Sequence, residues 1–337
     1  MFTTFKKDEY DFLVPEYAFN RRRQLFPRAD LPGLVNPIDY ENSQLDLSIP
    51  CRTCIGCRLD QSRQWADRMM IELDHSKCGI FVTLTYDPAF AHPCSIDSDD
   101  RVYYSLDVRD TQLFNKSLRK AFPDRKIRFF LAGEYGPSTW RPHYHAVYFG
   151  LSIDDFPDLM PLKRTSAGSL IYTSEKLQKL WKRGFISLSP VSWQTCAYVA
   201  RYTTKKLIDS NPLMSDYDLF NMHPEFMTCS RKPGLSGYFY DDHPDLVPDS
   251  IDDFKIYIRD PDGLKPVKSV KTPKYLLKQL QAVNPLLYNE YVDMQRVSSE
   301  DSLLLKLQRT SLPEAEYILS EEFTKQNSAK KLIRSDL

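Results

Sequence analysis

Two histidines and a nearby glutamate are residues of this chain whose types and spacing could bind a metal ion. His143 and His145 are separated by one residue within 141–149, an aromatic and aliphatic run that predicts a β-strand. Residues i and i+2 of a strand project from one face, so the two imidazoles would lie side by side and could share one metal ion. The alternative is two ordinary half-buried histidines.

A third ligand would have to come from a neighbouring strand. Glu134 lies near the end of a predicted strand at 126–135, and the short turn at 136–141 predicts an antiparallel hairpin. The hairpin would place Glu134 opposite His143 or His145. Two histidines and one carboxylate leave coordination positions open, as a catalytic metal requires. The competing interpretation is that Glu134 pairs with Arg141 across the turn.

A second group of chemically useful residues shares one face of a predicted helix. Tyr198 and Tyr202 are spaced i and i+4, Lys205 continues the stripe, and Lys206 follows it. A phenol attacks at neutral pH only when a cation lowers its pKa or a base takes its proton. The lysines could serve the tyrosines or a phosphate. The alternative is a tyrosine and alanine core stripe with a basic helix end.

The elements that must position these groups do not follow a strict alternation of strand and helix. We expect helices at 58–74, 107–122, 173–183 and 192–207, and strands at 80–86, 126–135, 142–149 and 185–191. This order, with a hairpin inside it, is typical of an α+β fold in which helices flank a central antiparallel sheet.

Three regions follow from the pattern along the chain. Residues 1–50 are rich in proline and turn residues without a sustained period, which predicts an extended N-terminal arm. Residues 51–208 hold the elements above and predict the main domain. Beyond it the pattern weakens, so 209–337 is expected to be a C-terminal accessory region with helical segments near 273–283 and 303–307.

Composition excludes some functions and leaves others open. The chain of 337 residues has only 11 glycines, none of them followed by lysine, so it contains no P-loop, and it has no G-x-G-x-x-G motif. The net charge is zero, but 176–208 carries seven lysines and arginines and no acidic residue. Such a patch can bind a polyanion because counterions respond to local charge. The alternative is a set of solvated helix faces.

The cysteines have the spacing of a metal site. Cys51, Cys54 and Cys57 have two residues between neighbours and could hold Zn²⁺ with a fourth ligand from His75, Cys78 or elsewhere. The alternative is reduced cysteines packed under the following helix. With no apolar run long enough to cross a bilayer and a charged amino terminus, we expect a cytosolic protein in a reducing compartment.

Taken together, these motifs resemble the HUH superfamily of single-strand endonucleases, specifically the rolling-circle replication initiation proteins of gokushovirus-like microviruses. Residues 81–86 are similar to the first motif strand of the family, 141–149 to its His-hydrophobe-His motif, and 198–206 to its Tyr-x-x-x-Tyr-x-x-Lys-Lys motif. The cysteine cluster and the segments 133–136 and 227–234 also look like that family.

The resemblance implies a fold, a site and an activity. The fold would be ferredoxin-like or RRM-like, and His143, His145 and Glu134 would hold Mg²⁺ or Mn²⁺. Tyrosine would cut the origin of single-stranded or supercoiled phage DNA by transesterification, forming a 5′-phosphotyrosine and a 3′-OH primer, and the second tyrosine would allow rejoining. We assign catalysis to Tyr198, Tyr202, Lys205 and Lys206, and DNA contacts to Arg141, Lys182, Arg183 and Arg201.

The same resemblance implies partners and a place of action. Without a P-loop, strand separation would need a host helicase, and a host DNA polymerase would extend the primer, in the cytoplasm of the infected bacterium. Two other functions stay open at this point. One is a relaxase or single-strand transposase, which typically uses one tyrosine, and the other is a non-enzymatic zinc-dependent DNA-binding protein.

Overall fold

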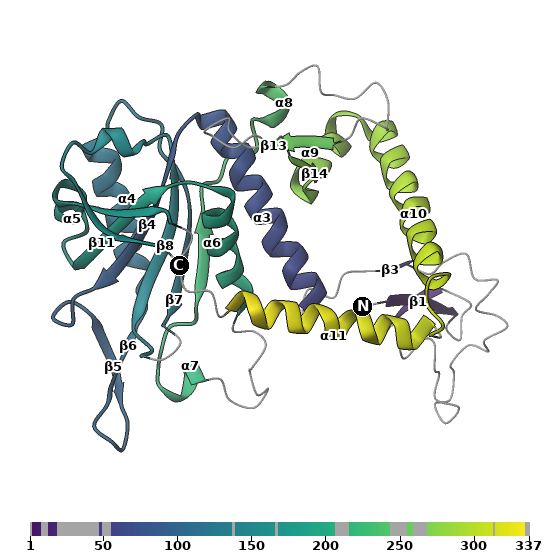
Figure 1. The fold of residues 1–337 in the computed structure, drawn as a ribbon, viewed down its shortest axis with the longest axis horizontal. Coiled ribbons are helices and arrows are strands. Elements are labelled where there is room, and N and C mark those ends of the chain that lie inside the picture. The colour runs from purple at the N-terminus through teal and green to yellow at the C-terminus, as the bar shows by residue number, and fades with distance from the viewer. Residues whose placement is uncertain are drawn as a thin grey trace. The chain divides into compact units, whose positions relative to one another are not determined.

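The computed structural model divides the chain into two compact units, one formed by Met1–Gln61 with Arg296–Asp336 and the other by Ser62–Gln295 with Leu337 (Figure 1). The residues whose structure is described are 2–7, 13–18, 47–48, 55–136, 139–165, 168–205, 216–242, 255–258, 268–312 and 314–333. Within these ranges no helix combines the length and the hydropathy needed to span a bilayer.

The first unit contains short strands within the region expected to be an extended arm. Strands β1 (Phe2–Lys7), β2 (Leu13–Ala18) and β3 (Leu47–Ser48) form an antiparallel sheet in the order β2-β1-β3. Helix α11 (Glu314–Ile333) belongs to the same unit. The division of the chain at residues 50 and 208 stays a prediction.

The second unit is built on a seven-stranded antiparallel sheet, as the sequence predicts. The strand order is β12-β7-β8-β4-β11-β10-β9. The strands are β4 (Gly79–Tyr86), β7 (Arg128–Tyr135), β8 (Pro142–Phe149), β9 (Leu159–Arg164), β10 (Leu170–Ser174), β11 (Gly184–Pro190) and β12 (Phe226–Cys229). The hairpin of β7 and β8 lies near the middle of this sheet, so both candidate metal strands are flanked by others.

Helices cover both faces of this sheet, and each face has its own core (Figure 1). Alternating residues of β4 and β8 separate the two cores, because successive strand residues point to opposite faces. Helices α3 (Ile55–Ser76) and α6 (Trp193–Lys205) pack on one face with Phe81 and Val147. Helices α4 (Val108–Ala121) and α5 (Glu175–Trp181) pack on the other with Val82 and Tyr144.

The helix ends follow the expected capping chemistry in two cases. Asp107 caps α4 by accepting a hydrogen bond from the backbone N–H of Arg109. Ser192 caps α6, since its hydroxyl accepts from the N–H of Thr195, whose own hydroxyl accepts from the N–H of Ser192. The predicted starts of both helices are therefore confirmed.

The structure corrects the prediction for 173–183. Only Glu175–Trp181 is helical, because the preceding residues form β10, whose last residue, Ser174, caps α5. Lys182, with a left-handed φ of 59°, is the C-cap in place of the glycine expected to end this helix. The glycine, Gly184, instead begins β11 with φ 151°, where a Cβ would lie 2.2 Å from the backbone nitrogen of Asp87.

Several strands carry no clear period in the sequence. The polar insertion after β4 forms a hairpin of β5 (His92–Ile96) and β6 (Val102–Ser105), separate from the main sheet. The edge strands β9 and β12 are short and largely solvent-facing or half-buried, so their residues lack the alternation of a buried strand. Towards the C-terminus lie α7 (Asp216–Leu219), α8 (Phe239–Asp242), the pair β13 (Lys255–Ile258) and β14 (Lys268–Lys271), α9 (Lys274–Val283) and α10 (Pro285–Leu307).

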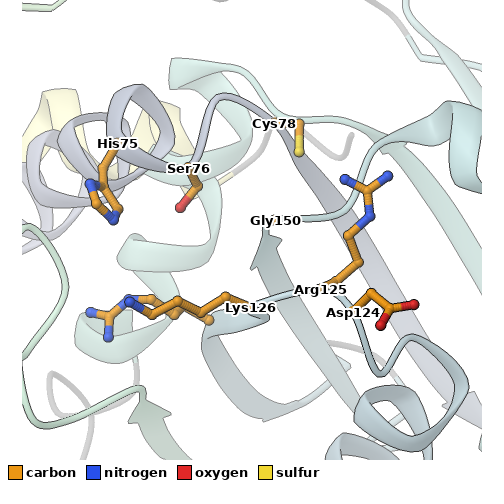
Figure 2. A pocket seen from close by; sticks show the side chains of 8 residues that line it. His75, Ser76, Cys78, Asp124, Arg125, Lys126 and Gly150 are labelled. Carbon is orange, nitrogen blue, oxygen red and sulfur yellow. The ribbon is translucent and has the colours of Figure 1, made fainter.

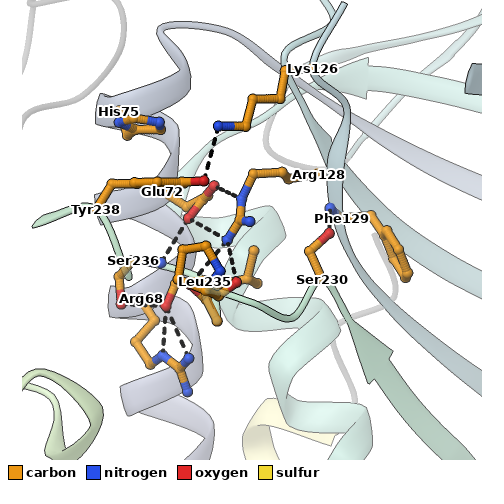
Figure 3. A network of polar contacts seen from close by, with 12 residues as sticks. Arg68, Glu72, His75, Lys126, Arg128, Phe129, Ser230, Leu235, Ser236 and Tyr238 are labelled. Atoms are coloured by element: carbon orange, nitrogen blue, oxygen red, sulfur yellow. Dashed lines mark hydrogen bonds and ion pairs between the residues drawn. The ribbon is translucent and has the colours of Figure 1, made fainter. Parts of the chain in front are cut away.

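A buried polar network joins α3 to the sheet and to the segment after β12 (Figure 3). Arg128 of β7 forms an ion pair with Glu72 of α3, whose side chain is fully buried. The Arg128 guanidinium also donates to the carbonyl oxygens of Pro233 and Gly234, and the N–H of Ser236 donates to Glu72 at 2.7 Å. The network therefore fixes the segment after β12 against the same helix that packs beside α6.

Candidate active site

The strand register aligns the candidate residues in two rows across one face of the sheet. Glu134 lies opposite His143, and Thr85 lies opposite His143 on the other side. In the next row, His145 lies between Ala132 and Thr83. Paired residues of an antiparallel sheet share a face, so both histidines and Glu134 point to the side on which α6 packs. The hairpin prediction for Glu134 is confirmed.

Glu134 receives both imidazoles on one carboxylate oxygen. The Nε2 atoms of His143 and His145 lie 2.5 and 2.9 Å from Oε1 of Glu134. The Glu134 side chain is only 4% exposed, against 19% for His143. The competing pairing with Arg141 is not adopted, since Arg141 donates to the carbonyl oxygen of Tyr86 at 2.8 Å.

The other ring nitrogens of the histidines contact groups that fix the ring orientations. Nδ1 of His143 lies 3.1 Å from the carbonyl oxygen of Arg141, to which it can only donate. Nδ1 of His145 lies 3.0 Å from the hydroxyl of Thr83 on β4. Both rings therefore direct Nε2 towards Glu134, as metal-ligating histidines held by an outer partner do.

The donor set of this cluster fits a divalent cation. Ligand atoms of Glu134, His143 and His145 lie within 4.8 Å of one another. Oε2 of Glu134 is buried and has no hydrogen-bond partner among the described residues, which is costly for a carboxylate unless a cation binds it. Burial alone would raise the pKa of Glu134, but hydrogen bonds from His143 and His145 outweigh it and lower that pKa, so the carboxylate is ionised at neutral pH.

Tyr198 of α6 lies directly over this cluster. Its ring centroid is 5.1 Å from that of His145 at an interplanar angle of 83°, and 6.2 Å from that of Phe81 at 84°. Neighbouring α6 residues Cys196 and Val199 are fully buried in the core of this face. Because α6 is anchored by these apolar residues, its tyrosine stripe is held at the border of the core, against the imidazoles.

The remaining residues of the stripe are described only in part. Tyr202 and Lys205 lie within α6, one and two turns after Tyr198, and their backbone positions follow the predicted spacing. Lys206 lies outside the described residues. The roles of Tyr202, Lys205 and Lys206 therefore stay predictions.

Comparison with known proteins gives the family. A family model for the replication-associated protein ORF2 matches residues 79–207, which run from β4 through α6. The replication-associated protein ORF2 of Spiroplasma virus 4 is 30% identical over 299 residues, covering 85% of each chain. The chain belongs to this family of replication-associated proteins.

Two further relatives of this family match over shorter stretches. The replication-associated protein VP4 of Bdellovibrio phage phiMH2K is 35% identical over 187 residues, 55% of each chain. The replication-associated protein ORF4 of Chlamydia phage 1 is 28% identical over 204 residues, 59% of this chain and 48% of the relative. The matches thus span about half the length of these two relatives. No solved structure gives a significant match.

The basic residues assigned to DNA lie in different settings in this family member. Arg141 is exposed at the start of β8, and Lys182 is exposed at the end of α5. Arg201 donates to the carbonyl oxygen of Ala197, one turn back in α6. Arg183 forms an ion pair with Asp110 of α4 at 2.8 Å, on the opposite side of the sheet from His143. The structure therefore brings Arg141 near the candidate site and directs Arg183 away from it.

The predicted zinc site lies mostly outside the described residues. Cys51 and Cys54 are outside them, and Cys57 is a half-buried residue in the first turn of α3. His75 lies 18 residues later in the same helix, about 27 Å away at 1.5 Å per residue, and Cys78 follows it. Neither can be the fourth ligand beside Cys57, so this part of the prediction is wrong. Zinc binding itself stays a prediction.

A second cluster of metal-binding residue types proves to be a structural network. His92, Asp107 and Asp110 also bring ligand atoms within 4.8 Å of one another. Asp110, however, accepts from the Tyr86 hydroxyl at 2.8 Å, and His92 Nε2 lies 2.9 Å from it, on the same carboxylate oxygen; Arg183 pairs with its other oxygen. With both oxygens engaged, this carboxylate differs from Glu134.

A pocket of about 250 Å³ lies at the far end of β8 from His143 (Figure 2). Its lining includes His75, Cys78, Arg125 and Lys126. The cations are engaged, since Arg125 pairs with Asp155, and Lys126 donates to the Tyr238 hydroxyl at 2.9 Å. Burial raises the pKa of the Cys78 thiol, which makes it a poor nucleophile. This pocket is therefore not the better candidate for the active site.

Two residues of the candidate site were not assigned from the sequence. Thr83 contacts His145, and Phe185 of β11 lies 58% exposed in the row that contains His143. The alternation Phe81, Thr83, Thr85 carries the signal for the first, because it places the threonines on the face of Phe81. No signal identifies the second, since strand pairing between β4 and β11 is not encoded in either strand alone.

Proposed function

We propose that this protein is a replication initiator that nicks single-stranded phage DNA by tyrosine transesterification and later rejoins the strand. The observation that carries the proposal is the position of Tyr198, whose ring lies edge-on to His145, over the three converging ligands. A hydrolytic metal nuclease has no need of a phenol beside its ligands. Family membership supports a role in replication.

The proposed chemistry uses each residue at a stated atom. His143 and His145 would bind Mg²⁺ or Mn²⁺ through Nε2 and Glu134 through its carboxylate, and the bound cation would supply Lewis-acid stabilisation of the phosphate charge. The Tyr198 hydroxyl loses its proton and its oxygen attacks phosphorus, forming the phosphotyrosine bond. The bond to the 3′ oxygen breaks and that oxygen takes a proton, so the proton count is unchanged.

The remaining motif residues complete the proposed cycle. Tyr202, one helical turn from Tyr198, would cut the regenerated origin after a round of synthesis, while the released 3′-OH attacks the first adduct and closes the circle. Lys205 and Lys206 would balance phosphate charge or lower the pKa of a phenol. A host helicase and DNA polymerase would act with the protein in the cytoplasm of the infected bacterium.

The test is adduct formation on labelled single-stranded DNA. Overlapping 5′- and 3′-labelled oligonucleotides covering the phage genome that encodes the chain would be incubated with the full protein and Mn²⁺. We expect a protein–DNA band that survives denaturation, requires metal, and is lost in Tyr198→Phe/Tyr202→Phe. Each single variant should alter the band, and His143→Ala should remove most of it.

Tyr172→Phe is the matched control. Tyr172 is a half-buried tyrosine of β10 that packs against the core on the opposite face of the sheet, so its loss should leave the adduct unchanged. An adduct that persists in the double tyrosine variant would place the nucleophile elsewhere and contradict the proposal.

A further inference from the structure

The row of residues that holds Glu134 and His143 continues over two more strands. Thr85 of β4 lies opposite His143, and Phe185 of β11 lies opposite Thr85. Adjacent strands are ~4.8 Å apart, so the Phe185 Cα is about 10 Å from that of His143. Because paired residues share a face, the Phe185 ring belongs to the same face as the candidate active site.

Phe185 is exposed although its strand lies inside the sheet. It is 58% exposed, whereas Ile186 and Leu188, which point to the opposite face of β11, are 2% and 1% exposed. Helix α6 packs on β7 and β8, and the small neighbours Thr85 and Ser187 on the same face are only half-buried. The aromatic ring therefore has small neighbours that leave room beside it for a flat ligand.

Arg141 supplies a cation between the histidines and this ring. Its guanidinium donates to the carbonyl oxygen of Tyr86 at the end of β4. Tyr86 is paired with Gly184, the residue before Phe185. Arg141 is exposed, and a guanidinium has five N–H donors, so others are available for a phosphate. A cation beside an exposed aromatic ring is the combination that binds single-stranded nucleic acid.

We propose that Phe185 stacks on a nucleobase of the single-stranded DNA bound at the active site, and that Arg141 binds the backbone phosphate between this base and the metal ligands. The inference rests on the proposed function and names a base-binding position for the same substrate. Single-stranded DNA is the occupant favoured over a second protein chain, because the ring shares one row with the metal ligands and has a cation beside it.

Binding without cleavage tests the stacking. The full chain would be titrated with fluorescently labelled oligo-dT in EDTA, and the affinity measured by anisotropy. Stacking on an aromatic side chain contributes ~1–3 kcal/mol per base, so Phe185→Ala should weaken binding about 5- to 150-fold. Phe185→Leu should lose most of the same affinity, because it keeps apolar bulk without a π-face. Phe185→Trp should bind at least as tightly as the wild type.

The matched control is Phe323→Ala, which removes a phenylalanine of α11 that is 64% exposed and should leave oligo-dT affinity unchanged. Arg141→Gln should reduce the slope of log affinity against log salt concentration by about 0.7, the value for one phosphate contact on a single strand. Circular dichroism of each variant would establish that the fold is retained.

Two results would overturn the inference. One is oligo-dT affinity in Phe185→Ala or Phe185→Leu equal to that of the wild type. The other is a change of oligomeric state in Phe185→Ala, measured by sedimentation, with unchanged DNA affinity, which would make this face an interface between copies. Failure of the proposed function has a different sign, namely no tyrosine-dependent adduct in the wild type, whatever the oligo-dT affinity.

Discussion

His145 depends on a neighbour from a different strand. Its Nδ1 contacts the hydroxyl of Thr83, and its ring stacks at 5.7 Å on Phe81. These two contacts from β4 leave Nε2 directed at Glu134. A ligand held in this way binds metal more tightly than a free imidazole, because its orientation and tautomer are set in advance.

Replacing Thr83 by valine tests this arrangement. Valine keeps the shape of threonine but removes the hydroxyl, so Thr83→Val should lower Mn²⁺ affinity by ~10- to 100-fold, measured by calorimetry on the full chain. Thr83→Ser keeps the hydroxyl and should retain most of the affinity. Mn²⁺ binding as tight in Thr83→Val as in the wild type would show that the contact does not position His145.

At the scale of elements, α3 is held to the sheet by a charge pair as well as by apolar packing. Arg128 and Glu72 lie in the interior with side chains 8% and 0% exposed, and each has backbone partners from the segment after β12. A second contact joins α3 to α6, since Trp193 Nε1 donates to Asp67 at 3.2 Å. The position of the tyrosine helix thus depends on α3.

We expect Glu72→Gln to destabilise the protein strongly. It leaves the buried Arg128 charge unpaired, so the free energy of unfolding should fall by ~3–5 kcal/mol in urea denaturation. In Glu72→Met/Arg128→Met, no charge remains buried, and a large part of that loss should be recovered. Equal destabilisation in the single and double variants would contradict this account of the network.

At the scale of the whole molecule, metal binding should be linked to folding. Glu134, His143 and His145 come from two strands that are joined only in the folded sheet, so the unfolded chain offers no comparable site. A cation that binds only the folded state stabilises it by mass action.

Thermal unfolding would measure this linkage without any DNA. At a Mn²⁺ concentration about 100 times the dissociation constant, the folded state should gain about 2.7 kcal/mol, and the midpoint should rise further with concentration. His145→Ala should unfold at a midpoint that does not depend on Mn²⁺. The same rise in the variant as in the wild type would place the metal site elsewhere.

Local sequence determined much of the architecture of this protein. The alternation in β4 and β8, the apolar period of α4 and the caps Asp107 and Ser192 act over a few residues, so they can be identified without the fold. The same holds for the approach of Glu134 to His143, because one short turn connects their strands. The edge strands β9 and β12 escaped prediction because their half-exposed residues have no buried face to set a period.

Only the tertiary structure decided which distant elements meet. The pairing of β4 with both β8 and β11 brings Thr83 to His145 and places Phe185 in the row of His143, and the packing of α6 on β7 and β8 places Tyr198 over His145. Such contacts join residues far apart in the chain, and their geometry is set by the order of strands in the sheet. No local period or spacing encodes that order, because it results from burying both sheet faces at once.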